Sequence, residues 1–137
     1  VLIQAFNVTH PVLQEILDND YQAFFNREIM ERHSFYYPPY MRLIKITLKH
    51  KKPLILNDGT KIFAKVLKTA LGNRVMGPAV PYISRVRGQY LLDILIKLER
   101  QTAIIKKAKS TIWEAAREMQ QTKGFSGVRV NVDVDPV

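Results

Sequence analysis

The sequence predicts an α+β protein whose larger part follows the order β-α-β-β-α-β, and two kinds of periodicity lead to this prediction. Apolar and polar residues alternate over residues 41–49 and 128–134, as expected for strands with one buried face. Residues 61–71 and 102–120 instead repeat apolar side chains at helical spacing. Right-handed connections would place both helices on one face of a four-stranded antiparallel sheet.

The first strand and the first helix of this arrangement each have one apolar face. In the strand, Ile44, Ile46 and Leu48 share the face that we expect to be buried. The run Asn57-Asp58-Gly59-Thr60 predicts a turn and a helix N-cap, and Gly72 predicts the end of the helix. The side chains expected to face the core from this helix are Ile62, Phe63, Val66, Leu67 and Ala70.

The second half of the domain repeats the pattern. Residues 79–87 and 90–98 predict two strands that form a hairpin joined at Gly88-Gln89. A helix over residues 102–120 then leads to the last strand, residues 128–134. Its expected inward side chains are Ile104, Ala108, Ile112, Ala115 and Met119. The complete order of elements is that of a ferredoxin-like fold.

A different organisation is expected before the first domain strand. Residues 1–6 predict a short strand, and Pro11 suits the first turn of a helix that runs to about Leu17. Asp20 is placed to cap a second helix. That helix has an apolar stripe in which residues recur at every fourth position: Tyr21, Phe25 and Ile29.

The pair Pro38-Pro39 cannot continue a helix, so the sequence predicts a boundary near Tyr37. The charge changes at the same place. Residues 1–37 hold two bases and five acids, a net charge of −3, whereas residues 38–137 hold 19 bases and seven acids, a net charge of +12. A positive surface of this size favours a polyanionic partner, for which nucleic acid, an anionic membrane and an acidic protein tail are the alternatives.

The composition excludes several classes of protein. No apolar run approaches the roughly 20 residues that span a bilayer. The 137 residues include no Cys, which rules out disulfides and thiolate zinc sites and fits a reducing cytoplasm. No basic stretch precedes an apolar one at the N-terminus, so no signal peptide is predicted. Because the chain begins at Val1, we expect it to be a piece of a longer protein.

No pattern in the chain predicts catalysis or metal binding. The three histidines are scattered, and no glycine-rich run has the spacing of a phosphate-binding loop. Asp133 and Asp135, two positions apart on the last strand, could chelate a metal, but without a third ligand we place them on the outer face of an edge strand. The sequence therefore predicts neither catalytic residues nor a cofactor for this chain.

Candidate binding residues are more numerous, and all are cationic or aromatic. Those of the first helix form one stripe, those of the second lie opposite its apolar sector, and two arginines share a strand face near the hairpin. Such residues can contact phosphates, stack on bases or dock a partner protein. The alternative is that these side chains are only solvated or pack against the rest of the protein. In chain order they are Lys61, Lys65, Lys68, Arg85, Arg87, Lys106, Lys109, Trp113 and Arg117.

Several short runs resemble, in order and spacing, the C-terminal end of the PriA family (primosomal protein N′), the bacterial replication-restart DNA helicases. The runs are Val1-Leu2-Ile3-Gln4 with His10-Pro11-Val12, Asp20-Tyr21 with Phe24-Phe25 and Arg27-Glu28, Tyr37-Pro38-Pro39-Tyr40 with Arg42-Leu43-Ile44, Gly77-Pro78-Ala79, Arg87-Gly88-Gln89-Tyr90 with Ile94-Leu95-Ile96-Lys97, and Val132-Asp133-Val134-Asp135-Pro136.

The resemblance implies that residues 1–37 are the tail of the second helicase lobe and that residues 38–137 form a C-terminal domain similar in fold to ribosomal protein S10. The family unwinds DNA in the 3′–5′ direction with ATP, recognises stalled forks and restarts replication through primosome assembly. DNA, primosome proteins and single-strand-binding protein are the implied partners. The ATP, Mg and Zn sites of the family lie upstream, outside this chain. Many relatives carry Arg where this chain has Leu91, so no DNA contact is inferred at that position.

Three functions therefore remain open at the level of sequence. The first is a DNA- and partner-binding domain of a restart helicase. The second is a protein-interaction module that docks an acidic tail, such as that of single-strand-binding protein, through Trp113. The third is a small-ligand domain, which the fold permits because a fold does not determine a function.

Overall fold

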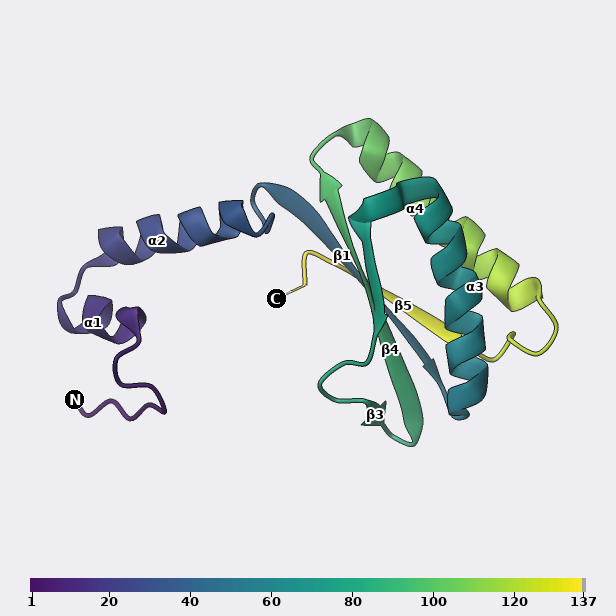
Figure 1. Cartoon of the computed structure of the whole chain (residues 1–137), viewed down its shortest axis with the longest axis horizontal. Helices are drawn as coiled ribbons and strands as arrows, with labels where there is room; N and C mark the ends of the chain where they lie inside the picture. The colour runs from purple at the N-terminus through teal and green to yellow at the C-terminus, as the bar shows by residue number, and fades with distance from the viewer. Residues whose placement is uncertain (137) are drawn as a thin grey trace. The chain divides into compact units, whose positions relative to one another are not determined.

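The computed structural model describes residues 1–136, and the chain divides into two compact units, Val1–Tyr36 and Tyr37–Val137. The larger unit has a sheet of order β2-β4-β1-β5, whose neighbours are all antiparallel, and β3 pairs with β4. Figure 1 shows both helices of this unit on the same face of the sheet. Its elements are β1 (Met41–His50), α3 (Pro53–Leu71), the short turn Gly72–Arg74, β2 (Val75–Ala79), β3 (Arg85–Val86), β4 (Gln89–Glu99), α4 (Thr102–Gln121) and β5 (Arg129–Val134). The α+β class is confirmed, and the order of elements differs from the predicted β-α-β-β-α-β by the additional two-residue strand β3, which gives the sheet five strands instead of four.

The core lies between the sheet and the two helices. β1 pairs with β4 along its whole length, and Ile46 stands opposite Ile94 in that ladder. Both side chains are fully buried, because opposed residues of an antiparallel pair point to the same face. The predicted inner face of β1 is confirmed, since Ile44 and Leu48 are also buried.

Helix α3 begins earlier than the sequence suggests. It starts at Pro53 and continues through Asn57-Asp58-Gly59-Thr60, so the predicted turn is wrong. A Cβ atom at Gly59 would lie 3.3 Å from side-chain atoms of both Phe125 and Val128. The missing side chain lets the turn after α4 pack directly on α3, and this packing outweighs the cost of about 1 kcal/mol that Gly imposes on a helix. Gly72 ends the helix as predicted, with a φ of 61°.

The predicted core-facing side chains of α3 do face the core, two of them fully buried and three at its margin. Phe63 and Leu67 are buried, and Ile62, Val66 and Ala70 pack at the margin of the core. The prediction for α4 is also confirmed. Ile104 packs at the margin, and the remaining inward side chains are buried: Ala108, Ile112, Ala115 and Met119.

The predicted strand over residues 79–87 is wrong, although the hairpin is present. β2 ends at Ala79, and only Arg85 and Val86 pair with β4. Pro81 has no backbone N–H to donate to a ladder, which helps to keep the intervening residues out of the sheet. Arg87 and Gly88 form a two-residue turn with φ values of 48° and 76°, the positive angles that favoured hairpin turns require.

The smaller unit has two helices, α1 (Pro11–Leu17) and α2 (Tyr21–Ser34), close to the predicted bounds. The side chain of Asp20 caps α2 by accepting a hydrogen bond of 2.9 Å from the N–H of Ala23. The strand predicted over residues 1–6 is absent. A strand needs a neighbour for its backbone hydrogen bonds, and the described residues of this unit include no other strand.

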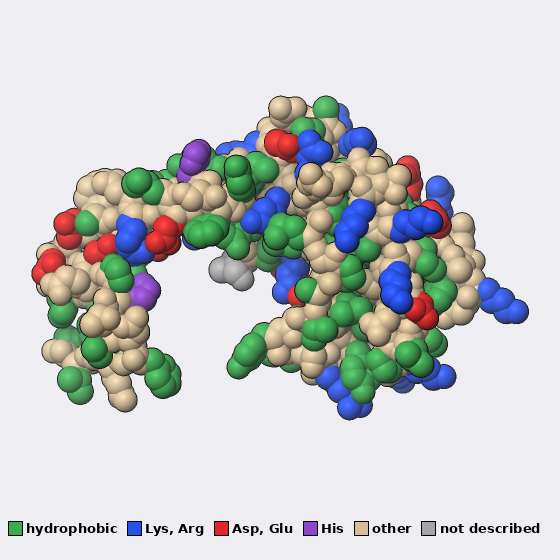
Figure 2. Space-filling view, in the orientation of Figure 1, with side chains coloured by type: hydrophobic (Ala, Val, Ile, Leu, Met, Phe, Trp, Pro, Cys, Tyr) green, Lys and Arg blue, Asp and Glu red, His purple; other side chains and the backbone are tan. Residues whose placement is uncertain are grey.

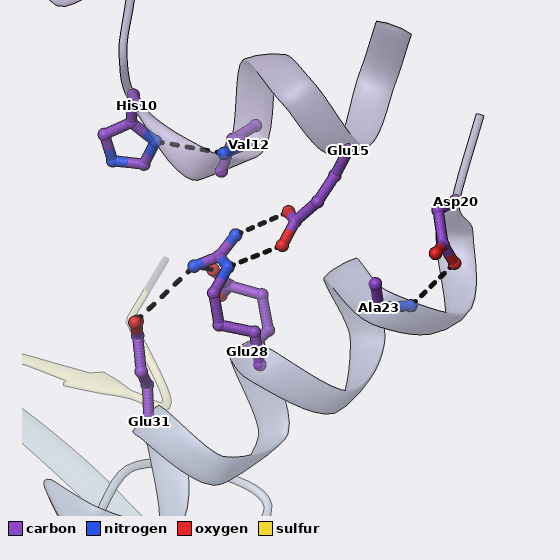
Figure 3. Close-up of polar contacts among 8 residues, drawn as sticks. His10, Val12, Glu15, Asp20, Ala23, Glu28 and Glu31 are labelled. Atoms are coloured by element: carbon purple, nitrogen blue, oxygen red, sulfur yellow. Dashed lines mark hydrogen bonds and ion pairs between the residues drawn. The ribbon is translucent and has the colours of Figure 1, made fainter. Parts of the chain in front are cut away.

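One guanidinium joins the two helices of the smaller unit. Nε and Nη2 of Arg27 each donate a hydrogen bond of 2.9 Å to the carboxylate of Glu15. Glu28 and Glu31 approach Nη1 of the same side chain, at 3.3 and 3.5 Å (Figure 3). The hydrogen bond with Arg27 lowers the pKa of Glu15, and the same bond raises the pKa of Arg27.

The contact at Gly59 gives a test of the packing between α3 and the end of α4. Gly59→Leu should lower the free energy of unfolding by about 1–3 kcal/mol, because the added side chain has no space beside Phe125 and Val128. Urea unfolding of the full chain followed by far-UV circular dichroism measures this. Asn57→Leu, an exposed position on the same helix, is the control and should change stability by less than about 0.5 kcal/mol. Equal stability of both variants would contradict the packing described.

The link between α1 and α2 should depend on pH. Since the folded pKa of Glu15 lies below its ordinary value of 4.5, its stabilising contribution is complete above that value and is lost as the pH falls through the lowered pKa. NMR titration of the Glu15 carboxyl carbon should give a midpoint below 4.5, and Arg27→Gln should move the midpoint up. Arg117→Gln removes the same charge from the other unit and should leave it unchanged. An identical midpoint with and without Arg27 would be the contrary result.

Candidate nucleic-acid interface

Cationic side chains are spread over the larger unit, whereas the smaller unit carries most of its charge as Asp and Glu on α1, α2 and their caps (Figure 2). Residues 59–92 contain six bases and no acid. This acid-free stretch covers most of α3, all of β2 and β3 and the start of β4. Residues 32–57 also contain six bases and no acid. The stretch of residues 59–92 differs from them in that it includes β2, an edge strand of the sheet.

The predicted stripe on α3 is exposed along that edge. Lys61, Lys65 and Lys68 recur at one helical turn, while Phe63 and Leu67 occupy the buried side of the helix. The three lysines line one side of a surface hollow of about 510 Å³ that Pro78 of β2 closes. Helix α3 therefore presents a basic surface of three lysines beside the β2 edge.

Two of these lysines are available for an anion. Nζ of Lys61 lies 3.3 Å from Asp58, in a pair whose side chains are 75% and 61% exposed and which solvent therefore weakens. Within residues 1–136, Lys65 and Lys68 form no ion pair. Their ammonium groups are thus exposed and uncompensated.

The two acids of β4, Asp93 and Glu99, are instead paired with nearby cations. The carboxylate of Glu99 accepts hydrogen bonds of 2.7 and 2.9 Å from Arg74, and these bonds lower the pKa of Glu99. Nζ of Lys45 lies 3.1 Å from Asp93. The negative charges of β4 are therefore largely neutralised at their own positions and do not oppose the positive surface.

Residues 80–88, which we call the arm, connect β2 to β4 through β3. Arg85 and Arg87 do not share a strand face as predicted, because Arg87 lies in the turn with a positive φ. The guanidinium carbon of Arg85 lies 5.0 Å from the centroid of the Tyr90 ring. The N–H of Leu91 donates a hydrogen bond of 2.9 Å to the carbonyl of Ser84, so this position fastens the arm to β4.

One exposed residue of the arm, Tyr82, is not among the residues that the sequence pattern predicts to bind a ligand. Tyr82 is fully exposed and lies between Pro81 and Ile83. Its place in an apolar run made it look like part of a strand. The signal that could have identified it is Pro81, because a proline inside a segment that otherwise reads as a strand argues against a central strand.

The α4 candidates lie at the opposite edge of the sheet. Lys109, Trp113 and Arg117 line a groove of about 760 Å³ between α4 and β5, and Lys106 is exposed one turn earlier on the helix. Trp113 is 78% exposed. The floor and walls of the groove are mainly apolar, and the side chains that form them are Ile44, Ile112, Ala116, Val130, Val132 and Val134.

The structure thus divides the nine predicted residues into two groups. Those of α3 and the arm lie at the β2 edge, and those of α4 lie at the β5 edge. The groove was not foreseen. The alternating valines of β5 point to the helix side, as the sequence pattern predicts for a buried face, but α4 leaves Val132 and Val134 about half exposed.

The pair Asp133 and Asp135 is not arranged on one strand face. β5 ends at Val134, and Asp135 follows with a φ of 51°. Burial acts to raise the pKa of Asp135, but hydrogen bonds from the N–H of Leu43 and from Arg42 outweigh it and lower that pKa. Asp135 thus fastens the end of β5 to β1.

Neither of two further kinds of site is found in the described part of the chain. Within residues 1–136, no three His, Asp or Glu side chains are grouped so that they could hold a metal ion. Over the same residues, no helix combines the length and the apolar character needed to cross a membrane.

The geometry defines a two-layer α+β domain with a basic edge and an apolar groove, and comparison with known proteins identifies its family. Residues 33–137 match the family model of the primosomal protein N C-terminal domain. The chain belongs to this family, which confirms the resemblance drawn from its sequence motifs.

Individual relatives agree with this assignment. The chain is 31% identical over 142 residues to the replication restart protein PriA of Haemophilus influenzae, 30% over 140 residues to that of Treponema pallidum and 26% over 138 residues to that of Bacillus subtilis. These alignments cover 99%, 100% and 99% of this chain but only 18%, 20% and 17% of the respective relatives. The chain thus spans a fifth or less of the length of these relatives.

Proposed function

We propose that this chain is the C-terminal DNA- and partner-binding part of an ATP-dependent 3′–5′ helicase that recognises stalled replication forks and restarts replication by primosome assembly. Family membership and the name that the relatives carry, replication restart protein PriA, support this setting. In this proposal residues 1–37 end the second helicase lobe and residues 38–137 form the binding domain. ATP, Mg and Zn belong to the rest of the parent protein, and this part contributes no catalytic residue.

The observation that carries DNA binding is the acid-free basic surface at the β2 edge. The α3 stripe from Lys61 to Lys68 spans about 10 Å, given the rise of 1.5 Å per residue. That length corresponds to about three nucleotides along one strand of a duplex. Three ammonium groups on one helix face can therefore follow one phosphate backbone without reading its bases.

Binding of this kind should depend on salt in proportion to the number of phosphates contacted. With forked or single-stranded DNA, the wild-type Kd should rise steeply with salt, and replacing Lys61, Lys65 and Lys68 together by Gln should reduce the slope of log Kd against log salt by about two to three. Fluorescence anisotropy with a labelled oligonucleotide measures the slope.

The matched variant replaces Lys106, Lys109 and Arg117 by Gln, which removes the same charge from the β5 edge. We expect this variant to retain more of the wild-type slope than the α3 variant. A larger loss at α4 would assign the DNA to the other edge. No binding at low salt, or binding that is independent of salt, would remove DNA from the proposed function.

A second candidate function, docking of an acidic tail such as that of single-strand-binding protein, is favoured by the α4–β5 groove. Trp113 offers a large apolar surface at its rim, and Lys109 and Arg117 lie beside it. An extended peptide with apolar and acidic side chains suits a lining of this kind. The mainly apolar lining gives less support to the third interpretation, a small-ligand site with convergent polar groups.

Truncation of the groove tryptophan tests this second candidate. Trp113→Ala should weaken binding of a peptide copy of the acidic tail by about 30-fold or more if Trp113 is a central contact, which corresponds to about 2 kcal/mol. Isothermal titration calorimetry measures the affinity. Tyr82→Ala, which removes an exposed aromatic side chain at the opposite edge, should leave the affinity unchanged. Equal losses in both variants, or none in either, would exclude the groove as the docking site.

A further inference from the structure

The arm exposes more apolar surface than a connecting loop needs. Tyr82 is fully exposed, and Val80, Ile83 and Val86 are 68%, 61% and 44% exposed. Apolar side chains gathered on one exposed segment are typical of a contact surface. Since none of the four contributes to the core, the fold gives no reason for their being apolar.

The arm is held in place at both of its ends. Pro81 restricts the backbone next to Tyr82, and the pairs of β3 with β4 fix the far end. The hydrogen bond from Leu91 to Ser84 and the stacking of Arg85 on Tyr90 add to this support. Tyr82 is therefore displayed from a supported segment, which limits the conformational entropy lost when it binds something.

The charge around the arm indicates the chemical character of a ligand that would bind there. Arg85 and Arg87 are its only charged residues, and it lies within the acid-free stretch of residues 59–92. It leaves the sheet from β2, whose Pro78 borders the α3 lysines. A ligand that fits here combines negative charge with a flat apolar surface. Unpaired nucleotides have both, because their phosphates are anionic and their bases are free to stack.

We propose that Tyr82 stacks on an unpaired base of single-stranded DNA while Arg85, Arg87 and the α3 lysines contact the flanking phosphates. This inference rests on the proposed DNA-binding function and deepens it by stating that the arm selects single-stranded over double-stranded DNA. In a duplex the bases are already stacked on one another, so Tyr82 gains nothing there. The arm thus gives this domain a preference for single-stranded regions, such as those beside a branch point.

Affinity measurements on single and double strands test the inference. For the full chain, Tyr82→Ala should weaken binding of a labelled single-stranded oligonucleotide roughly 5- to 100-fold. It should leave duplex affinity and the salt slope unchanged, because it removes no charge. Tyr82→Phe keeps the ring and should retain the wild-type affinity. Arg87→Gln should instead lower the salt slope by about one.

Three outcomes would overturn this inference. Equal single-strand affinity of Tyr82→Ala and wild type would exclude stacking and leave the proposed DNA binding standing. Equal losses on single and double strands would show that Tyr82 does not distinguish them. If the wild-type chain bound neither DNA at low salt, the proposed function would fail together with the inference. Phe6→Ala, at an exposed position of the smaller unit, is the control for a general effect of losing an exposed aromatic side chain.

Discussion

The antiparallel pairing of β1 with β4 is the interaction on which the rest of the larger unit depends. It sets opposed apolar residues, such as Ile46 and Ile94, on one face, where both are fully buried. Helices α3 and α4 cover that face, and each therefore has an outer side in solvent. Because β1 and β4 are the inner strands, β2 and β5 become the two edges. The basic surface and the apolar groove lie at different edges as a direct result of this arrangement.

Much of the fold could be predicted because the spacing of apolar residues along a helix or strand indicates which of its sides is buried. The apolar faces of β1 and α4 are examples. Local turn signals were less reliable: Gly59 lies inside α3 because the turn after α4 packs against it, a contact distant in sequence. Residues 1–6 have strand-like side chains but lack a neighbouring strand. The arm has the sequence pattern of a strand although most of it is not in the sheet. A pattern of apolar residues does not show whether those residues lie in the core or on the surface.

The candidate site could be predicted only within single elements. The spacing of Lys61, Lys65 and Lys68 placed them on one helix face, and that of Trp113 placed it away from the core. The sequence could not show which edge of the sheet each helix covers, so it did not separate the two groups of residues. Nor could it show that Val132, on the core side of β5, extends beyond the cover of α4 and forms part of a groove.

The two edges also differ from ordinary strand edges in a way that concerns self-association. An open edge strand normally presents a row of free backbone groups on which another strand can pair. β2 is short, contains Pro78, which has no N–H to offer, and shows a register shift between Met76 and Ala79. β5 carries Arg129 and Asp133 on its outer face, and charged residues of this kind disfavour edge-to-edge stacking. The domain can therefore leave both edges of its sheet open to ligands without pairing edge to edge with other copies of itself.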